Sequence, residues 1–443
     1  NYGVGMGGRR PWDVYQQINE TRGHLGHVDP STRRIHLGWE EEVMPSDEGV
    51  QVFSGIWFNS NGLQAARENQ FSKGKVRVFV DPDDLKLATV LMPGYRDPIE
   101  VELQMTVFAD MTLMEVLQPH GYDFYWYAPK ADRFLRRAWQ EPHPPEAAAD
   151  IARFARWCDD RGVEFGIGLS PWEVFNHFDG AARRALAGKL DFFESVGVGR
   201  LAVLFDDMKS DTPDLAARQG EIIDWIHQRT GFRQLAVCPS YYSDDTVLDR
   251  VFGQRPPGYL EELGKALDPG VDVFWTGEEV CSREISAGHL RRVAGQLGRK
   301  PLLWDNYPVN DGPRMSPHLH LRAYAERDPE LAQVIDGHAI NPALQPSLSC
   351  LPALTLADVY RDGSAYDPSA AWHGAAERML GPALAQCVAA DLTSLQDQGR
   401  TGLSGAAIDE LRHRYMGFDH PAAAEIVAWL DGAYTAQAIP TDA

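Results

Sequence analysis

Short apolar runs recur along residues 124–342 at intervals of roughly 30 to 40 residues, which is the spacing of βα units. Each run is rich in β-branched and aromatic residues, is almost free of polar ones, and ends in polar or charged residues. Continuous apolar strands are typical of parallel sheets that are buried on both faces. The seven runs are Phe124–Lys130, Glu164–Ser170, Arg200–Asp207, Leu235–Tyr242, Val271–Gly277, Pro301–Asp311 and His338–Pro342.

The stretches between these runs predict helices. Pro145–Arg161 begins with proline and acidic residues, as the first turn of a helix favours. Ala182–Val196 and Asp214–Thr230 carry apolar residues at helical spacing. Alternating strands and helices with polar strand ends predict an α/β fold, a (β/α)8 barrel with its site at the C-terminal ends of the strands. The alternative is an open doubly wound sheet, which the missing Gly-rich nucleotide fingerprint disfavours.

The flanking regions differ in pattern from this central part. Residues 1–118 predict a small β-rich unit, and the region after Pro342 is rich in Ala, Leu, Glu and Gln, which favour helices. We therefore predict a β-rich accessory segment (1–118), a catalytic barrel (119–345) and a helical region (346–443). The expected strands of the first part are Gln51–Ser60, Lys75–Asp81, Ala88–Leu91 and Ile99–Phe108, and the expected helices of the last are Ala370–Gln398 and Ala406–His413.

Composition excludes several classes of protein. The 443 residues are 44% hydrophobic and 24% charged, which excludes a largely disordered or fibrous chain. The 42 basic and 63 acidic residues give a net charge of −21, which argues against a surface that grips nucleic acid throughout and suits an uncharged substrate such as a sugar.

The five cysteines are widely spaced and form no CxxC pair, so we expect neither a disulfide framework nor a zinc knuckle, and a cytoplasmic setting is the default. We see no apolar run long enough for a membrane span and no signal peptide, although a first residue other than Met fits a processed or truncated start. No metal-ligand spacing or phosphate-binding loop occurs, so no metal and no cofactor is predicted.

The adjacent carboxylates Asp206 and Asp207 are the strongest chemical signal, because they end a predicted strand. In different environments, one carboxylate can stay ionised while the other keeps a proton, as cleavage of a glycosidic bond requires. A bare Asp-Asp pair is more often a solvated strand end or a helix cap. Here other strand ends would converge with it at the mouth of a barrel, and their mixture of polar and aromatic groups suits a sugar. These residues are Lys130, Tyr242, Trp275, Asp305, Asn306, Asp311 and Asn341.

These motifs, in this order, resemble the family 84 glycoside hydrolases, the β-N-acetylglucosaminidase and O-GlcNAcase group, over about residues 110–430. One such motif would be weak, but six together are specific. They are Tyr127-Ala128-Pro129-Lys130 followed by Asp132 and Arg136, Leu204-Phe205-Asp206-Asp207-Met208, Cys238-Pro239-Ser240-Tyr241-Tyr242, Phe274-Trp275-Thr276-Gly277 leading to Val280, Ser282 and Glu284, Trp304-Asp305-Asn306 with Asn310-Asp311, and Asn341-Pro342.

The resemblance implies retaining hydrolysis of terminal β-linked N-acetylglucosamine, in which the acetamido oxygen of the substrate attacks the anomeric carbon and forms an oxazoline. It implies that Asp206 orients and polarises the acetamido N–H, and that Asp207 is the general acid and then the base. Tyr242 would line the acetamido pocket, and Trp275 is about as well explained by packing in the core. The partner would be a glycan or glycoprotein that carries N-acetylglucosamine. Sugar hydroxyls or the acetamido group would be held by Lys130, Asn306, Asp311 and Asn341.

The chain departs from the family pattern at the first barrel strand. The family opens its barrel with Gly-Phe-Tyr-Gly and then Pro-Trp, some 30 residues before the Tyr-Ala-Pro-Lys strand. Ile99–Phe108 stands at that position and could fill the strand without carrying that motif, whereas a Gly-Arg-Arg-Pro-Trp run lies far upstream at Gly8–Trp12. The loss puts part of the sugar pocket and the closure of the barrel in question, because a missing strand exposes two edges.

Residues 1–118 resemble, less specifically, the small C-terminal β-barrel of Mu-type transposases, which contacts DNA. The matching runs are Gly7–Asp13, Phe53–Ser60, Lys75–Val78 and Asp81–Leu85. Nearby basic residues are few (Arg67, Lys73, Lys75 and Arg77), so a plain accessory domain is about as well supported as a nucleic-acid partner. The alternatives to a hydrolase are a DNA-binding or transposition accessory protein and an inactive fusion.

Overall fold

The structure is a computed structural model. It describes residues 30–37, 39–45, 50–52, 56–68, 74–81, 84–95, 97–103, 113–130, 132–208 and 212–434. The chain forms two compact units, residues 1–105 and residues 106–443, and each is described by itself below. This division falls earlier than the boundary at residue 118 that we expected from the sequence.

The first unit contains a six-stranded sheet in the order β1-β4-β5-β6-β3-β2, in which every recorded strand pair within the sheet is antiparallel. Its inner face buries Phe58, Val78, Val90 and Val101, which form the unit's own hydrophobic core. The elements are α2 (Pro30–Leu37), β1 (Trp39–Val43), β2 (Val50–Val52), β3 (Ile56–Asn59), α3 (Asn61–Glu68), β4 (Val76–Asp81), β5 (Asp84–Leu91) and β6 (Ile99–Leu103).

The expectation that Ile99–Phe108 could open the barrel is wrong for its described part. Residues 99–103 form β6, which pairs with β5 and β3 in the antiparallel sheet, and residues 104–108 lie outside the described residues. The sequence of β6, Ile-Glu-Val-Glu-Leu, alternates apolar and acidic residues. That pattern fits a sheet with one face in water, whereas a barrel strand is buried on both faces.

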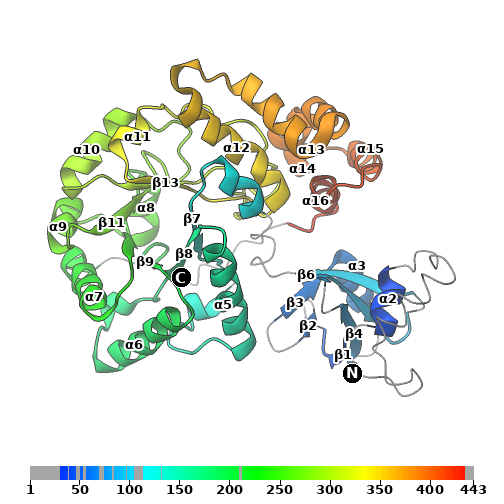
Figure 1. Ribbon diagram of the computed structural model, residues 1–443, viewed down its shortest axis with the longest axis horizontal. Helices are drawn as coiled ribbons and strands as arrows, with labels where there is room; N and C mark the ends of the chain where they lie inside the picture. The colour runs from blue at the N-terminus through cyan, green and yellow to red at the C-terminus, as the bar shows by residue number, and fades with distance from the viewer. Residues whose placement is uncertain are drawn as a thin grey trace. The chain divides into compact units, whose positions relative to one another are not determined.

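The second unit is built on a parallel sheet of seven strands in the order β13-β12-β11-β10-β9-β8-β7. Figure 1 shows helices α5, α6, α7, α9 and α10 ranged along the outside of this sheet. The strands are β7 (Phe124–Tyr127), β8 (Glu164–Leu169), β9 (Arg200–Leu204), β10 (Gln234–Cys238), β11 (Val271–Trp275), β12 (Leu302–Asp305) and β13 (Gly337–Ile340). The helices between them are α5 (Pro145–Asp159), α6 (Gly180–Ser195), α7 (Leu215–Arg229), α8 (Thr246–Phe252), α9 (Tyr259–Ala266), α10 (Ala287–Leu297) and α11 (Leu331–Val334).

Aromatic contacts across the sheet show that it curls. Trp126 of β7 and Phe274 of β11 are separated by three strands in the sheet, yet their ring centroids lie 5.9 Å apart. Phe274 also meets Trp304 of β12 edge to face, at 5.1 Å. These three rings therefore fill the inside of a barrel-like sheet, which confirms the predicted fold class against the open sheet. Within the described residues, β7 and β13 are the two edge strands of the sheet.

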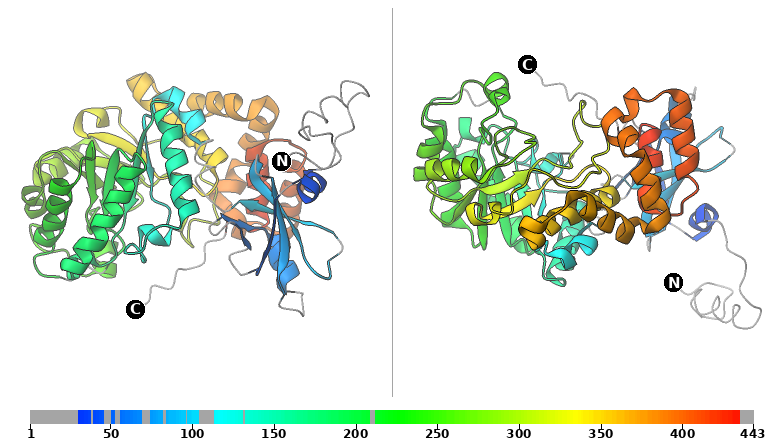
Figure 2. Two further views of the ribbon diagram at one scale, coloured as in Figure 1. Left: turned by 60° about the horizontal axis from the view of Figure 1, so that its bottom comes forward. Right: turned by 90° about the horizontal axis from the view of Figure 1, so that it is seen from above.

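A helical region follows β13, as we predicted. Figure 2 shows α12 lying along the barrel and the later helices gathered beyond it. Their shared core includes Leu351, Trp372, Tyr415 and Trp429. In the part of the chain that the structure describes, no helix is both long enough and apolar enough to cross a membrane. The main helices of the region are α12 (Pro346–Asp362), α13 (Pro368–Leu392), α14 (Gly399–Gly402), α15 (Gly405–Tyr415) and α16 (Pro421–Leu430), with a π-helical turn at Thr393–Gln398.

Candidate active site

Asp206 and Asp207 stand where β9 gives way to a turn. The strand ends at Leu204, and the N–H of Phe205 donates to the carbonyl of Cys238 at 2.9 Å, so contact with the β10 strand extends one residue further. Asp207 then adopts a left-handed backbone conformation with φ of 55°. Aspartate is one of the few residues that tolerate this conformation, because its short side chain can bond locally. The turn therefore places two successive carboxylates at the C-terminal edge of the sheet.

The Asp206 carboxylate is held in an environment that disfavours its charge. Its Oδ1 atom is buried and has no hydrogen-bond partner. Burial raises the pKa of Asp206 from its ordinary value of 3.8 to about 6, and the negative charge of Asp207 adds to the increase. The positive charges of Arg136 and Lys130 act in the opposite direction and offset part of it.

The Asp207 carboxylate is more open to solvent, with 37% of its side chain exposed. Arg136, which follows the β7 strand in the chain, lies with its Nη2 atom 3.6 Å from Asp207 Oδ2 and is itself only 16% exposed. The two neighbouring carboxylates thus have different surroundings. Arg136 occurs in the motif that carried the resemblance, but the sequence alone gave it no role in the site.

Lys130 and Asp311 join two strand ends across the site. The Nζ atom of Lys130, after β7, lies 3.0 Å from Oδ2 of Asp311, which follows β12. Burial would lower the pKa of Lys130, but the negative charges of Asp311, Asp207 and Asp206 outweigh this and raise it. Lys130 therefore stays charged and couples Asp311 electrostatically to the carboxylate pair.

Two carboxamides form a second polar group. Asn306, directly after β12, donates from Nδ2 to the carbonyl of Val280 at 2.7 Å. Its Oδ1 accepts from Nδ2 of Asn341 at 3.0 Å and from the indole of Trp304 at 3.1 Å. These bonds fix which end of the Asn306 carboxamide is the oxygen. Val280 occurs in one of the motifs, but its carbonyl was given no role, because a backbone group leaves no signal in the sequence.

Tyr242 and Cys238 lie near the carboxylate pair. Burial raises the pKa of the Tyr242 phenol well above its ordinary value, and the charges of Asp207 and Asp206 contribute. The same causes raise the pKa of Cys238, so its thiol stays protonated and unreactive at neutral pH. Tyr242 can therefore act as a neutral hydroxyl, and the sequence did not single out Cys238 as its neighbour.

The structure does not bring Trp275 to this group. Its indole N–H donates to Nε2 of His289 on α10 at 2.9 Å, and its side chain is fully buried. Since Phe274 faces the inside of the sheet, the next residue on the strand must face the helices. Asp305, which is 1% exposed, is bound by Arg327 and His338. Neither side chain is available to a sugar.

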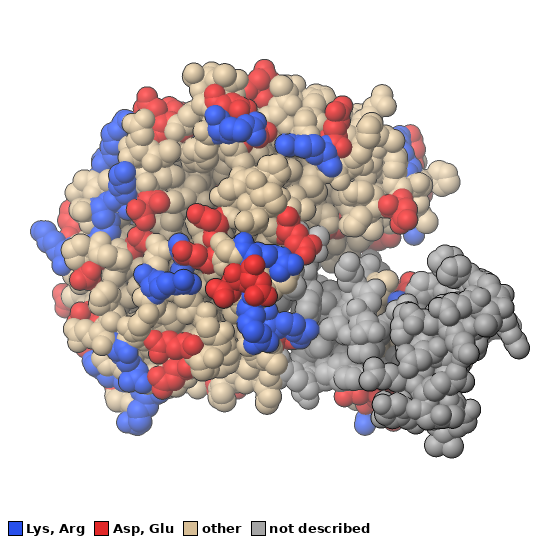
Figure 3. Space-filling model, in the orientation of Figure 1, with Lys and Arg blue, Asp and Glu red and all other residues tan. Residues whose placement is uncertain are grey.

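The remaining predicted residues are polar groups at the C-terminal ends of the strands: the Asp206–Asp207 pair in contrasting environments, the ion pair of Lys130 and Asp311, a phenol and two carboxamides. Within the described residues, no group of three or more His, Cys, Asp or Glu side chains could hold a metal ion. On the face shown in Figure 3, basic and acidic side chains are interspersed over the described surface. This arrangement can move a proton and hold a neutral polyol.

Comparisons with known proteins identify the family of the chain. The family whose model is described as beta-N-acetylglucosaminidase matches residues 108–394. Two proteins described as Protein O-GlcNAcase, from Mus musculus and Rattus norvegicus, are each 30% identical over 258 residues, which cover 56% of this chain and 28% of each relative. The chain thus spans little more than a quarter of the length of these relatives.

A solved structure gives the same similarity in three dimensions. An O-GlcNAc hydrolase of Thermobaculum terrenum, carrying an aspartate-to-asparagine substitution, matches with a TM-score of 0.60 and 29% identity. The match covers 74% of this chain and 78% of that chain.

Proposed function

The chain belongs to the β-N-acetylglucosaminidase family of glycoside hydrolases, and on this premise we propose that it removes terminal β-linked N-acetylglucosamine with retention of configuration. The observation that carries the proposal is the pair Asp206–Asp207, in which one carboxylate has a buried oxygen, Oδ1, without a hydrogen-bond partner and the other, 37% exposed, lies beside Arg136. A hydrolase of this kind needs two carboxyl groups with different tasks.

In the first step, the carbonyl oxygen of the substrate's acetamido group attacks the anomeric carbon, and the bond to the leaving oxygen breaks. Asp206 accepts a hydrogen bond from the acetamido N–H, which makes the carbonyl oxygen more nucleophilic. Asp207 gives its proton to the leaving oxygen, and the product is a protonated oxazoline (an oxazolinium ion) whose N–H stays hydrogen-bonded to Asp206. In the second step Asp207 takes a proton from water, the water attacks the anomeric carbon, and the acetamide is restored. Two inversions at one carbon give net retention.

The charges in the site support this division of roles. The pair resists losing its last proton until about pH 6, because Asp206 is buried beside Asp207. A hydrogen bond donated by the acetamido N–H favours the ionised form of Asp206. Substrate binding itself would thus favour the ionised form of the group that must orient the acetamido group.

The rest of the site would hold the sugar. Lys130 and Asp311 offer a donor and an acceptor side by side, which suits the hydroxyl groups of a sugar. Asn306 and Asn341 would hold hydroxyls or the acetamido group, and Tyr242 would line the acetamido pocket. The substrate would be a glycan or glycoprotein that ends in N-acetylglucosamine. The cytoplasmic location and the nucleic-acid partner of residues 1–118 stay predictions, and nothing found here supports the latter.

The test is release of nitrophenol from 4-nitrophenyl β-N-acetylglucosaminide, followed in Asp207→Ala and Asp206→Ala. We expect Asp207→Ala to lose about 10²- to 10⁴-fold in kcat/KM, the usual contribution of a general acid. With 2,4-dinitrophenol as the leaving group, which departs without a proton, Asp207→Ala should recover much of this loss. Asp206→Ala should recover none of it. Equal losses on both substrates would contradict the assignment of the acid.

A second measurement tests the nucleophile. Replacing the acetamido methyl hydrogens by fluorine makes the carbonyl oxygen less nucleophilic. We expect kcat/KM to fall steeply from the acetamido to the trifluoroacetamido substrate if that oxygen attacks in the transition state. A nearly constant kcat/KM would indicate an enzyme carboxylate as the nucleophile.

A further inference from the structure

A buried ionic cluster lies outside the residues to which a role in the site has been given. Asp305 is 1% exposed, and its carboxylate accepts from Nε of Arg327 at 2.7 Å and from Nη2 at 3.0 Å. His338 lies with Nε2 3.1 Å from Asp305 Oδ2, and its Nδ1 is 2.7 Å from the hydroxyl of Tyr360. All bonds are satisfied when Tyr360 donates to the imidazole and the imidazole donates to Asp305.

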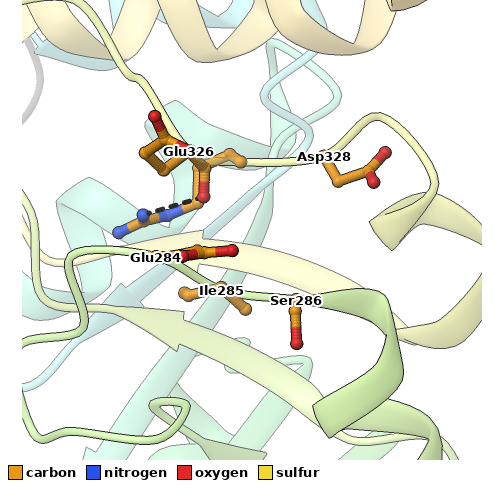
Figure 4. Close-up of a pocket in the computed structure, with 6 residues that line it drawn as sticks. Glu284, Ile285, Ser286, Glu326 and Asp328 are labelled. Carbon is orange, nitrogen blue, oxygen red and sulfur yellow. Dashed lines mark hydrogen bonds between the residues drawn. The ribbon is translucent and has the colours of Figure 1, made fainter.

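The guanidinium of Arg327 also binds a neighbouring loop. It donates to the carbonyls of Ser282 at 2.8 Å and Arg283 at 2.6 Å. The next residues continue the contact, because Ile285 forms an isolated parallel bridge with Arg327. Figure 4 shows the two segments running side by side along a pocket of about 320 Å³, whose lining includes Glu284 and Asp328.

The three segments that the cluster joins also carry Asn306, Asn341 and Val280. Asp305 immediately precedes Asn306, and its carbonyl accepts the backbone N–H of Asn341 at 2.9 Å. The loop bound through Ser282 supplies Val280, whose carbonyl holds the Asn306 side chain. His338 lies on β13, three residues before Asn341. The ionic cluster therefore lies behind the carboxamide pair and fixes its position from three sides.

Burying charged groups costs desolvation free energy, and apolar residues of similar volume would often make the protein at least as stable. Stability alone therefore does not explain the cluster. We propose that Arg327, with Asp305 and His338, is a positioning group that holds Asn306 and Asn341 in the geometry required for the sugar. The inference rests on the proposed function, because it assigns these carboxamides to substrate. Substrate-positioning groups are sensitive to displacements of about 1 Å, which can lower rates by about 10²-fold.

The test compares Arg327→Lys with Arg327→Met. Lysine keeps the charge next to Asp305 but cannot donate to both of its oxygens and to two carbonyls together. We expect Arg327→Lys to lower kcat/KM by roughly tenfold, and Arg327→Met by more if it folds, in line with the cost of misplacing a positioning group. The decisive measurement is a double-mutant cycle with Asn306→Ala. If Arg327 acts through Asn306, the Lys substitution should cost less than about twofold in the Asn306→Ala background. Full additivity of the two losses would overturn the proposal.

Arg299→Lys is the matched control. Its guanidinium also bridges loop carbonyls, those of Gly264, Leu267, Asp268 and Val271, at the opposite end of the strands. The substitution should lower the midpoint of thermal unfolding without changing kcat/KM in either background. A loss of kcat/KM in Arg299→Lys as large as that in Arg327→Lys would mean that general loosening of the barrel causes both losses.

A crystal structure of Arg327→Lys separates this inference from the proposed function. If the wild-type protein fails to turn over the aryl substrate, the proposed function fails. The positioning role is still decided by whether the bonds from Asn306 to Val280 and from Asn341 to Asn306 persist. We expect both to lengthen beyond 3.5 Å in Arg327→Lys, the usual limit of a hydrogen bond. An unchanged carboxamide pair would overturn the inference regardless of activity.

Discussion

At the scale of single residues, Asp206 is harder to ionise in the folded chain than in the unfolded one. Its pKa of about 6 in the fold lies above the ordinary value of 3.8. Folding therefore favours the protonated form. This contribution to stability is complete below about pH 4 and is lost as the pH rises through 6. At neutral pH the buried charge of Asp206 reduces the stability of the protein, as is common where function fixes a residue.

Asp206→Asn should for this reason stabilise the protein at neutral pH. The amide has nearly the same shape and carries no charge. A shift of one pKa unit corresponds to about 1.4 kcal/mol of unfolding free energy, and partial access of solvent to the side chain reduces this effect. We therefore expect the unfolding free energy to rise by about 1 to 2 kcal/mol at pH 7.5. Below pH 4 the gain should vanish. Urea unfolding at both pH values measures it, with Asp409→Asn at an exposed position of α15 as the control. A gain that is the same at both pH values would contradict the assignment.

The same protonation equilibrium should govern catalysis. Asp206 accepts the acetamido N–H only in its ionised form, so kcat/KM should fall about tenfold per pH unit as the pH drops below about 6. The decrease should be the same with 4-nitrophenol and with 2,4-dinitrophenol as the leaving group, since it does not depend on proton delivery. Stopped assays between pH 4.5 and 9 measure both profiles, in the range where the pair titrates. A decrease that disappears with 2,4-dinitrophenol would place the titrating group in proton delivery.

At the scale of elements, the apolar content of the strands was enough to predict the parallel sheet. Each of the seven expected runs overlaps a strand, and each strand ends earlier than its run. The run ending at Asp207 gives a strand that ends at Leu204, because the apolar pattern continues through the buried Phe205 into the turn. The residues of the candidate site lie in the last part of each run, after the strand has ended. The prediction of Ile99–Phe108 as a strand of the first part is confirmed for Ile99–Leu103, whose alternation of apolar and acidic residues also argues against a barrel strand.

Other parts of the site could not be predicted from local sequence. The contact between Arg327 and Asp305 joins a loop to a strand end, and no periodicity marks a guanidinium that will be buried. The inward or outward direction of Trp275 depends on the register of β11, which became clear only from the contacts of Phe274. Such information lies in contacts between segments distant in the chain, and local patterns do not contain it.

Gly168 offers a test of how closely the strand ends must approach. A Cβ atom at this position of β8 would lie 2.6 Å from Cβ of Ala128 and 2.9 Å from Cδ1 of Leu204. These neighbours lead directly into Lys130 and Asp206. We expect Gly168→Ala to cost about 1 to 3 kcal/mol of stability through overpacking. It should also lower kcat/KM by roughly tenfold or more, because it moves two strand ends of the site apart.

The control is Gly188→Ala on the exposed face of α6, where an added Cβ meets nothing within 4 Å. This substitution should leave kcat/KM unchanged and add about 0.5 to 1 kcal/mol of stability, since alanine favours a helix. A Gly168→Ala enzyme with lowered stability but full kcat/KM would show that the strand ends tolerate displacement.

At the scale of the whole molecule, the chain combines two units with separate cores. The antiparallel sheet packs around Phe58 and Val90, whereas the second unit buries its own clusters, such as that around Trp372 and Tyr415. Every residue proposed to act on the sugar belongs to the second unit, beginning at Lys130. The family match also starts at residue 108. The first unit is therefore an addition to the hydrolase pattern, and its own role is a separate question.

Removing residues 1–105 tests this independence. A domain with its own core can in principle fold alone, so residues 106–443 should unfold in one cooperative transition. Their kcat/KM for the aryl substrate should stay within about twofold of the full chain, the range expected for sites that do not interact. Loss of folding or of activity would show that residues 106–443 need the first unit to be stable or active.

Residues 1–105, prepared separately, can be tested for DNA binding in a low-salt gel-shift assay. Retarded DNA there would assign the first unit a function apart from hydrolysis, whereas its absence together with full activity would leave the first unit as a plain accessory domain.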